Sequence, residues 1–312
     1  MSIQSDIHQT ESSITIGEAI SEAFSPLFSN IKTAFKFTVL PALSFTLIFA
    51  LAFYYISNYV STFLANQGST QPDFTLSMGL SIFAVFLISG LISIQFYTAW
   101  IRFLHKGETS FTSTLIFNLK TRHLVILGKG LLLSIALNIL MLIFNLAVSS
   151  LLFFTPAILS VLITIVLAVL ISVLFLRFSY VFPAAALGQP YSFLSSWEHT
   201  KNQWLRLFIS FFILSLIFIV IMFGFNILIS LAFSILGGMF TLFDFSAESL
   251  AQSENPMEIL TSPLFLASII PMYFVIIMIS MVSYIPFFNM HNYCFRKNTG
   301  WQQDDEIADR FS

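Results

Sequence analysis

Residues 152–176 read LFFTPAILSVLITIVLAVLISVLFL, and no charged side chain interrupts them. A helix rises 1.5 Å per residue, so about 20 residues cross the ~30 Å hydrocarbon core of a bilayer. This stretch is long enough to do so. Across the 312 residues of the chain, 57% are hydrophobic and only 9% are charged, whereas soluble domains carry about 25% charged residues. The composition therefore predicts a membrane protein.

Six apolar blocks of this kind predict an all-α fold, a polytopic bundle of six transmembrane helices with interfacial amphipathic helices. The chain then divides into a cytoplasmic N-terminal tail with an amphipathic helix (1–36), a membrane domain (37–290) and a cytoplasmic C-terminal tail (291–312). The blocks are Phe37–Tyr59, Met78–Trp100, Val125–Leu146, Leu152–Leu176, Leu207–Ile229 (with room to extend to Leu236) and Leu264–Phe288.

The positive charges are distributed unequally between the connections. The 13 Lys and Arg residues lie before the first block, after the last, or at the connections between blocks two and three and between blocks four and five. The other three connections carry only acids. Because Lys and Arg are retained on the cytoplasmic side, the pattern predicts a membrane protein with both termini in the cytoplasm. Met1–Glu22 lacks the basic start and cleavage site of a signal peptide.

The approach to the first block is itself patterned. Thr15-Ile16-Gly17-Glu18 resembles a capping box, and apolar residues follow it at helical spacing. We expect an amphipathic helix that lies either in the membrane interface or packed under the bundle. Similar stretches precede the third and the fifth block. They indicate either three two-helix repeats or, slightly favoured, unrelated helix hairpins that each carry Lys and Arg at their cytoplasmic ends. The three stretches run from Phe24 to Lys32, Phe111 to Lys120 and Phe193 to Lys201.

Few residues in the sequence suggest chemistry. The centres of the blocks carry no Asp, Glu, Lys, Arg or His, which would mark transport or proton relay. The five histidines lack metal-ligand spacing, and no nucleotide-binding or nucleophile motif is present. We expect no catalytic residue, no metal site and no cofactor. Asn138 and Asn145 share one helix face, which either lines a polar path or, more simply, hydrogen-bonds to another helix.

The connection between blocks four and five is the most distinctive segment. Residues 177–184 read RFSYVFPA and residues 195–208 read SSWEHTKNQWLRLF. Trp197 and Trp204 are seven residues apart, so we expect them to share a face of one interfacial helix, with Lys201 near that face and Arg206 by the next span. Arg177 either reaches the interface or binds a carbonyl or phosphate near Pro183. Such a cluster suits anionic lipid headgroups, but a generic anchor that sets helix depth is the simpler interpretation.

This segment resembles a superfamily of bacterial polytopic proteins. It comprises the YciC-like inner-membrane proteins and the membrane domain attached to some glycerophosphoryl diester phosphodiesterases. There, an Arg near the end of one span precedes Pro-Ala, and Ser-Trp-x-x-Thr-Lys leads into the next span. Two positions depart from that pattern, His199 in place of an aliphatic residue and Asn202 in place of Gly. The resemblance implies a helical bundle in the bacterial inner membrane. Because the phosphodiesterase domain is lacking, the hydrolase activity of those enzymes does not carry over.

Three functions follow as hypotheses. The first is a non-catalytic membrane protein that supports envelope or lipid homeostasis, with membrane lipids, a membrane protein or a second copy of the chain as partner. The second is a transporter or channel for a small or amphipathic solute. The third is a lipid enzyme, which would require Arg177, His199, Lys201 and His291 to converge on one pocket. A net charge of −2 gives no support to nucleic acid as a partner.

Overall fold

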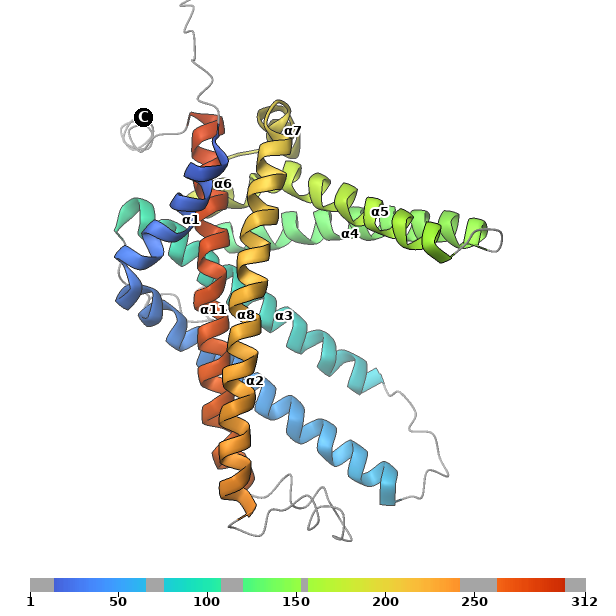
Figure 1. Ribbon diagram of the computed structural model, residues 1–312, viewed down its shortest axis with the longest axis vertical. Coiled ribbons are helices and arrows are strands. Elements are labelled where there is room, and N and C mark those ends of the chain that lie inside the picture. The colour runs from blue at the N-terminus through green and yellow to red at the C-terminus, as the bar shows by residue number, and fades with distance from the viewer. Residues whose placement is uncertain (1–13, 66–75, 108–119, 153–156, 242–262, 301–312) are drawn as a thin grey trace, which may run out of the picture. The chain divides into compact units, whose positions relative to one another are not determined.

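The computed structural model describes residues 14–65, 76–107, 120–152, 157–241 and 263–300 (Figure 1). Every element in these ranges is a helix, so the all-α prediction is confirmed. The helices are α1 Ile16–Ser29, α2 Ile31–Ala65, α3 Leu76–Lys106, α4 Thr121–Leu152, α5 Ala157–Phe178, α6 Val181–Leu187, α7 Phe193–Thr200, α8 Trp204–Thr241 and α11 Pro263–Thr299.

Six of these helices, α2, α3, α4, α5, α8 and α11, are long and apolar enough to cross a membrane. Each of the six predicted blocks corresponds to one of them. The fourth block begins earlier than its helix, because Leu152 is the last residue of α4 and α5 starts at Ala157. The sequence allowed the fifth to extend to Leu236, and its helix continues to Thr241. The chain is therefore a multi-pass membrane protein.

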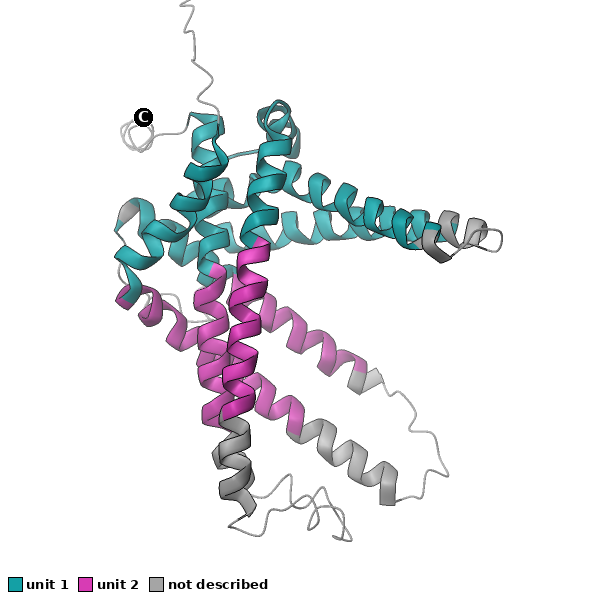
Figure 2. Cartoon of the chain, in the orientation of Figure 1, with its two compact units in different colours: residues 1–31, 94–214, 285–312 teal, residues 32–93, 215–284 magenta. Residues whose placement is uncertain are grey.

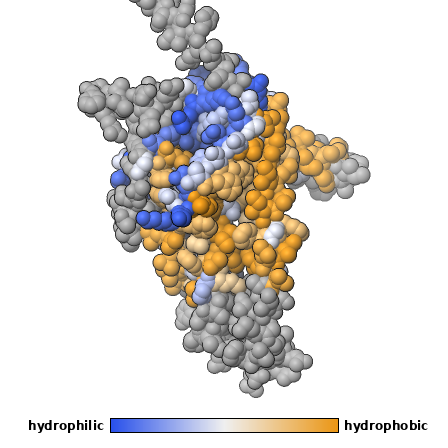
Figure 3. All heavy atoms as spheres, turned by 60° about the vertical axis from the view of Figure 1, so that its left-hand side comes forward, coloured by the Kyte–Doolittle hydropathy of each residue, from blue (hydrophilic) through white to orange (hydrophobic). Residues whose placement is uncertain are grey.

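The spanning helices bury little of themselves inside the protein. At most 33% of the most apolar stretch of any span is buried, and in α4 and α5 the share is 11%. Leu51, Phe86 and Val220 are each at least 70% exposed. Leaving such a side chain in water forgoes about 1.5–3 kcal/mol of transfer free energy, so lipid must cover these faces. Figure 3 shows hydrophobic residues over much of the visible surface and hydrophilic ones gathered in one region.

Several polar side chains on the spans hydrogen-bond within their own helix. The hydroxyls of Ser172 and Ser280 each donate to the carbonyl four residues earlier, at 2.8 Å. Asn138 does the same, since its Nδ2 lies 2.8 Å from the Ser134 carbonyl oxygen. Asn138 and Asn145 are both exposed. Asn138 bonds to the carbonyl and the hydroxyl of Ser134, one turn earlier in α4. The polar path and the interhelical bond stay predictions for this face.

The described residues form two compact units (Figure 2). Unit 2, residues 32–93 and 215–284, is held by aromatic contacts between spanning helices. In it, the rings of Phe49 and Tyr273 stack with centroids 4.2 Å apart, and those of Phe218 and Tyr284 are 5.3 Å apart. Unit 1, residues 1–31, 94–214 and 285–312, contains α1, the α4–α5 hairpin, α6 and α7. All the candidate site residues lie in unit 1.

Helix α1 begins as the capping pattern predicts, since the Thr15 hydroxyl oxygen accepts from the Glu18 backbone N–H at 3.3 Å. Its buried residues are Ala19, Ala23 and Leu27, which follow each other at one-turn spacing. Ala19 and Ala23 belong to the hydrophobic core of unit 1. These contacts support the packed interpretation of α1 over a helix that lies only on the membrane surface.

Asn289 of α11 links α1 to α3 through two buried hydrogen bonds. The Trp100 indole N–H donates to the Asn289 Oδ1 at 2.7 Å, and the Asn289 Nδ2 donates to the Ala23 carbonyl oxygen at 2.8 Å. All three residues are at most 2% exposed. One amide therefore joins α1, α3 and α11 inside unit 1.

Candidate functional site

The end of α5 is followed by two short helices that fix the site. In α6, Pro183 occupies the first turn, where a helix has no acceptor for its missing N–H. Gly188 ends α6 in the left-handed conformation, with φ of 85°. Its N–H donates to the Ala185 carbonyl at 3.1 Å, which closes the last turn. Ser192 then caps α7, its hydroxyl oxygen accepting from the Ser195 N–H at 3.0 Å.

Arg177, one residue before the end of α5, reaches across to α7. Its Nη2 donates to the Trp197 carbonyl oxygen at 3.0 Å, and its guanidinium carbon lies 3.2 Å from the centre of the Trp197 ring. The Phe178 ring also stacks on Trp197, at 5.3 Å between centroids. The Arg177 Nε is buried and has no hydrogen-bond partner among the described residues. Arg177 therefore binds a carbonyl, as one expectation had it, but on Trp197 rather than near Pro183.

The main chain of Arg177 binds the same helix. Its carbonyl oxygen accepts from the Ser196 hydroxyl at 2.6 Å and from the Thr200 hydroxyl at 3.4 Å. Ser196 and Thr200 are four residues apart and both fully buried, so one face of α7 is fixed on the end of α5. The Ser-Trp-x-x-Thr stretch noted in the sequence thus has a structural reason.

Lys129 is the site residue that the sequence reasoning missed. The reasoning placed it with the connection between blocks two and three, but it lies inside α4. Its Nζ donates to the Tyr191 carbonyl oxygen at 2.7 Å. The Gly128-Lys129-Gly130 run inside an apolar block was the available signal. Gly130 lies against α6, because a Cβ there would be 3.7 Å from the Phe182 ring.

Tyr191 links this contact to α7. Its hydroxyl lies 2.8 Å from the His199 Nδ1, and the two rings stack at 5.8 Å between centroids. Burial, helped by the nearby Glu198 carboxylate, raises the pKa of the Tyr191 hydroxyl above its ordinary value. Tyr191 therefore stays protonated at neutral pH and keeps a hydrogen to donate.

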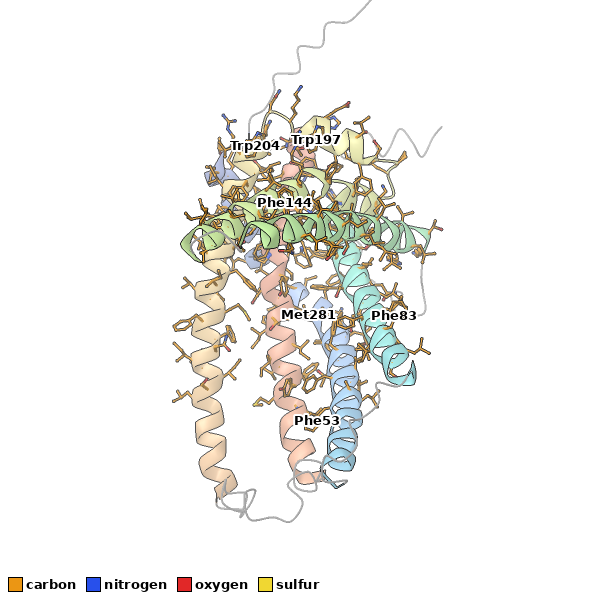
Figure 4. The ribbon with its side chains drawn as sticks, turned by 90° about the vertical axis from the view of Figure 1, so that its right-hand side faces the viewer. Phe53, Phe83, Phe144, Trp197, Trp204 and Met281 are labelled. Atoms are coloured by element: carbon orange, nitrogen blue, oxygen red, sulfur yellow. The ribbon has the colours of Figure 1, made fainter. Side chains whose placement is uncertain are left out.

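The remaining candidate residues lie around the turn between α7 and α8. Helix α7 ends at Thr200 and α8 begins at Trp204, so the prediction that Trp197 and Trp204 share a face of one helix is wrong. Lys201 and Arg206 are exposed, and Trp204 is 41% exposed. Both tryptophans are labelled in Figure 4. The structure brings Arg177 and Trp197 together and leaves Lys201, Trp204 and Arg206 open to their surroundings.

The charges around the site are strongly one-sided. Residues 121–214 include five Lys or Arg residues and a single acid, Glu198. Neither Arg177 nor Lys129 has a carboxylate partner in the part of the chain that the structure describes. By contrast, Lys297 forms an ion pair with Glu18. Among the described residues, main-chain carbonyls and the Trp197 ring, rather than carboxylates, therefore compensate the charges of Arg177 and Lys129.

Three of the four residues that a lipid enzyme would need have different hydrogen-bond partners. The His291 Nε2 lies 2.8 Å from the Ser179 hydroxyl, while His199 bonds to Tyr191 and Arg177 to Trp197. Within the described ranges, no group of three or more His, Cys, Asp or Glu side chains is placed to hold a metal ion.

Comparison of the chain with protein-family models, with curated proteins and with solved structures finds no match. What is established is therefore its own geometry: a multi-pass membrane protein with a cationic, aromatic site where α5 meets α7.

Proposed function

We propose that this membrane protein is non-catalytic and supports envelope or lipid homeostasis by binding anionic lipid at the α5–α7 junction. The observation that carries the proposal is the environment of Arg177. Its guanidinium has an aromatic ring on one face and a carbonyl on one edge, but no carboxylate partner among the described residues. A lipid phosphate supplies the missing negative charge.

Physical chemistry favours phosphate as the counter-ion. Arg presents a planar fork of donors that matches phosphate oxygens, and stacking on an aromatic ring holds that fork in place. Aromatic rings collect at the headgroup level of a bilayer, and basic pockets between transmembrane helices bind anionic headgroups. Lys201, Trp204 and Arg206, all exposed, extend the same chemistry beyond the Arg177–Trp197 pair.

We infer from the charge pattern that both termini lie in the cytoplasm, and from the resemblance to the YciC-like proteins that the membrane is a bacterial inner membrane. In that orientation the α5–α7 junction is at the inner leaflet, where anionic lipids attract basic side chains at about 1 kcal/mol each. The resemblance to the YciC-like proteins supports the same placement.

The test is native mass spectrometry of the protein extracted in native lipid particles. We expect a retained anionic phospholipid, and Arg177→Gln to reduce its occupancy about tenfold, which corresponds to ~1.4 kcal/mol for one charge-assisted contact. Arg177→Lys should also weaken retention, because an ammonium group lacks the planar stack. The matched control is Arg296→Gln, since Arg296 is an exposed arginine at the end of α11.

Two results would contradict the proposal. One is a protein that retains no anionic phospholipid. The other is equal lipid loss in Arg177→Gln and Arg296→Gln. That result would mean that lipid is held by the general positive charge of the surface and not by a specific contact with Arg177.

A further inference from the structure

Lys129 adds a second, separate cation to this site. It comes from α4, whereas Arg177 comes from α5, and the two side chains bind opposite ends of the stretch from Tyr191 to Trp197. Both side chains are partly buried. Among the described residues, a main-chain carbonyl is the acceptor for each, and neither has a carboxylate partner.

The two cations bind carbonyls of the same short stretch of chain. The carbonyls that they bind belong to Tyr191 and Trp197, with α7 beginning at Phe193. Four helical steps of ~1.5 Å and two extended steps of at most ~3.5 Å separate them, so the carbonyls lie no more than about 13 Å apart. Each cation stays within hydrogen-bond distance of its carbonyl.

The charge count argues for more than one phosphate. A single phosphodiester carries one negative charge and neutralises one of the two cations. A second phosphate, joined to the first by a bridge that reaches from one cation to the other, would neutralise the other without a second lipid. An unpaired, partly buried charge is costly, so the site gains from a ligand that satisfies both cations.

We propose that Lys129 and Arg177 together make the site selective for a lipid with two linked phosphates over a lipid with one. This inference rests on the proposed function, since it names the class of lipid that the same site takes. Arg177, stacked on Trp197, binds one phosphate of either lipid. Lys129 binds the second phosphate, which only the two-phosphate lipid has.

The experiment reconstitutes the full-length protein in lipid particles of phosphatidylethanolamine with either phosphatidylglycerol or diphosphatidylglycerol. Lipid retention is measured by native mass spectrometry. Lys129→Met should lower retention of diphosphatidylglycerol about tenfold and leave phosphatidylglycerol within about twofold, as expected for one lost charge-assisted contact. Arg177→Gln should lower both. Lys129→Arg keeps the charge and should restore the preference, which separates loss of charge from misfolding. Lys36→Met, at an exposed lysine of α2, is the control.

The outcomes separate the two proposals. If both lipids are retained equally and Lys129→Met changes neither, the two-phosphate inference is overturned while the lipid-binding function stands. If neither lipid is retained by the wild-type protein, both fail. A further arm adds inorganic pyrophosphate to particles of phosphatidylglycerol. Pyrophosphate that binds the wild-type protein but not Lys129→Met would assign the site to a soluble diphosphate and overturn its assignment to a lipid.

Discussion

At the scale of single residues, the structure depends on polar groups that sequence reasoning treats as mild. Asn289 lies one residue past the end of the sixth predicted block, where the sequence gives it no special role. In the structure it is 2% exposed and serves as both acceptor and donor between three helices. Asn226 is another spanning amide, but it is exposed and donates only to the Met222 carbonyl of its own helix, at 2.8 Å. The two residues should therefore respond differently to substitution.

Asn289→Leu should destabilise the protein by about 1–3 kcal/mol for each buried group that loses its partner. The groups are the Trp100 indole N–H, which loses its acceptor, and the Ala23 carbonyl, which loses a donor. The measurement is the thermal unfolding midpoint in detergent. Asn226→Leu, the matched control, should be neutral or slightly stabilising. An equal fall of the unfolding midpoint in both variants would mean that the hydrogen bonds of Asn289 to Trp100 and Ala23 do not stabilise the fold.

At the scale of elements, the C-terminus of α6 sets the position of the whole α6–α7 segment. Gly188 has a φ of 85°, a left-handed conformation that costs a residue with a side chain about 1–2 kcal/mol. Gly188→Ala should lower stability by that amount and weaken lipid retention, because Tyr191 and the start of α7 follow directly. Gly224→Ala should do neither, because an added Cβ at this interior position of α8 would meet no atom within 4 Å. Comparing unfolding midpoints and bound lipid for the two variants checks the prediction.

The attachment of α1 depends on pH through Glu18. Hydrogen bonds from Lys297, and then from Tyr293, lower the pKa of the Glu18 carboxyl from 4.5 to about 2. Because the folded pKa lies below the unfolded one, the stabilisation is complete above pH 4.5 and is lost as the pH falls toward 2. Wild-type protein should therefore have a higher unfolding midpoint than Glu18→Gln at pH 7, and the gap should narrow at pH 3.

Glu22→Gln provides the control for this pH effect. Glu22 lies on the same helix and is exposed, without an ion pair in the described chain. Its unfolding midpoint should follow that of the wild type at both pH values. A gap between wild type and Glu18→Gln that stays constant from pH 7 to pH 3 would contradict the role of the Glu18–Lys297 ion pair.

The elements themselves divide into those that the sequence predicts and those that it does not. Block hydropathy predicts the six spans, since each is a local property of about 20 residues. The break between α7 and α8 is not local, because neither Gly nor Pro lies between Trp197 and Trp204. Contacts with distant residues accompany it: Ser196 and Thr200 bond to Arg177, and the Gln203 Oε1 accepts from the Ile14 N–H at 3.1 Å. The role of Lys129 escaped prediction for the same reason, since its partner is 62 residues away.

At the scale of the whole molecule, the charge pattern makes a topological prediction. The native thiol, Cys294, is fully buried and should stay unlabelled. Ser69→Cys and Ser253→Cys, in connections that lack Lys and Arg, should react with a membrane-impermeant maleimide on intact cells. Asp305→Cys, in the C-terminal tail, should react only after lysis. Labelling of Asp305→Cys on intact cells would reverse the orientation and place the α5–α7 junction at the outer leaflet.

The contrast in burial between α5 and α6 has a consequence for how this chain can evolve. Where α5 faces lipid, a substitution between Leu, Ile, Val and Phe changes only which apolar atoms meet fluid acyl chains. In α6, Ala184, Ala185 and Ala186 are each at most 2% exposed, so even one added methylene meets a neighbour. A saturation library selected for membrane expression should therefore tolerate apolar side chains of different shape along α5 and reject charged ones. Along α6 the same selection should reject side chains larger than alanine at residues 184–186. Those three positions should vary least among related sequences.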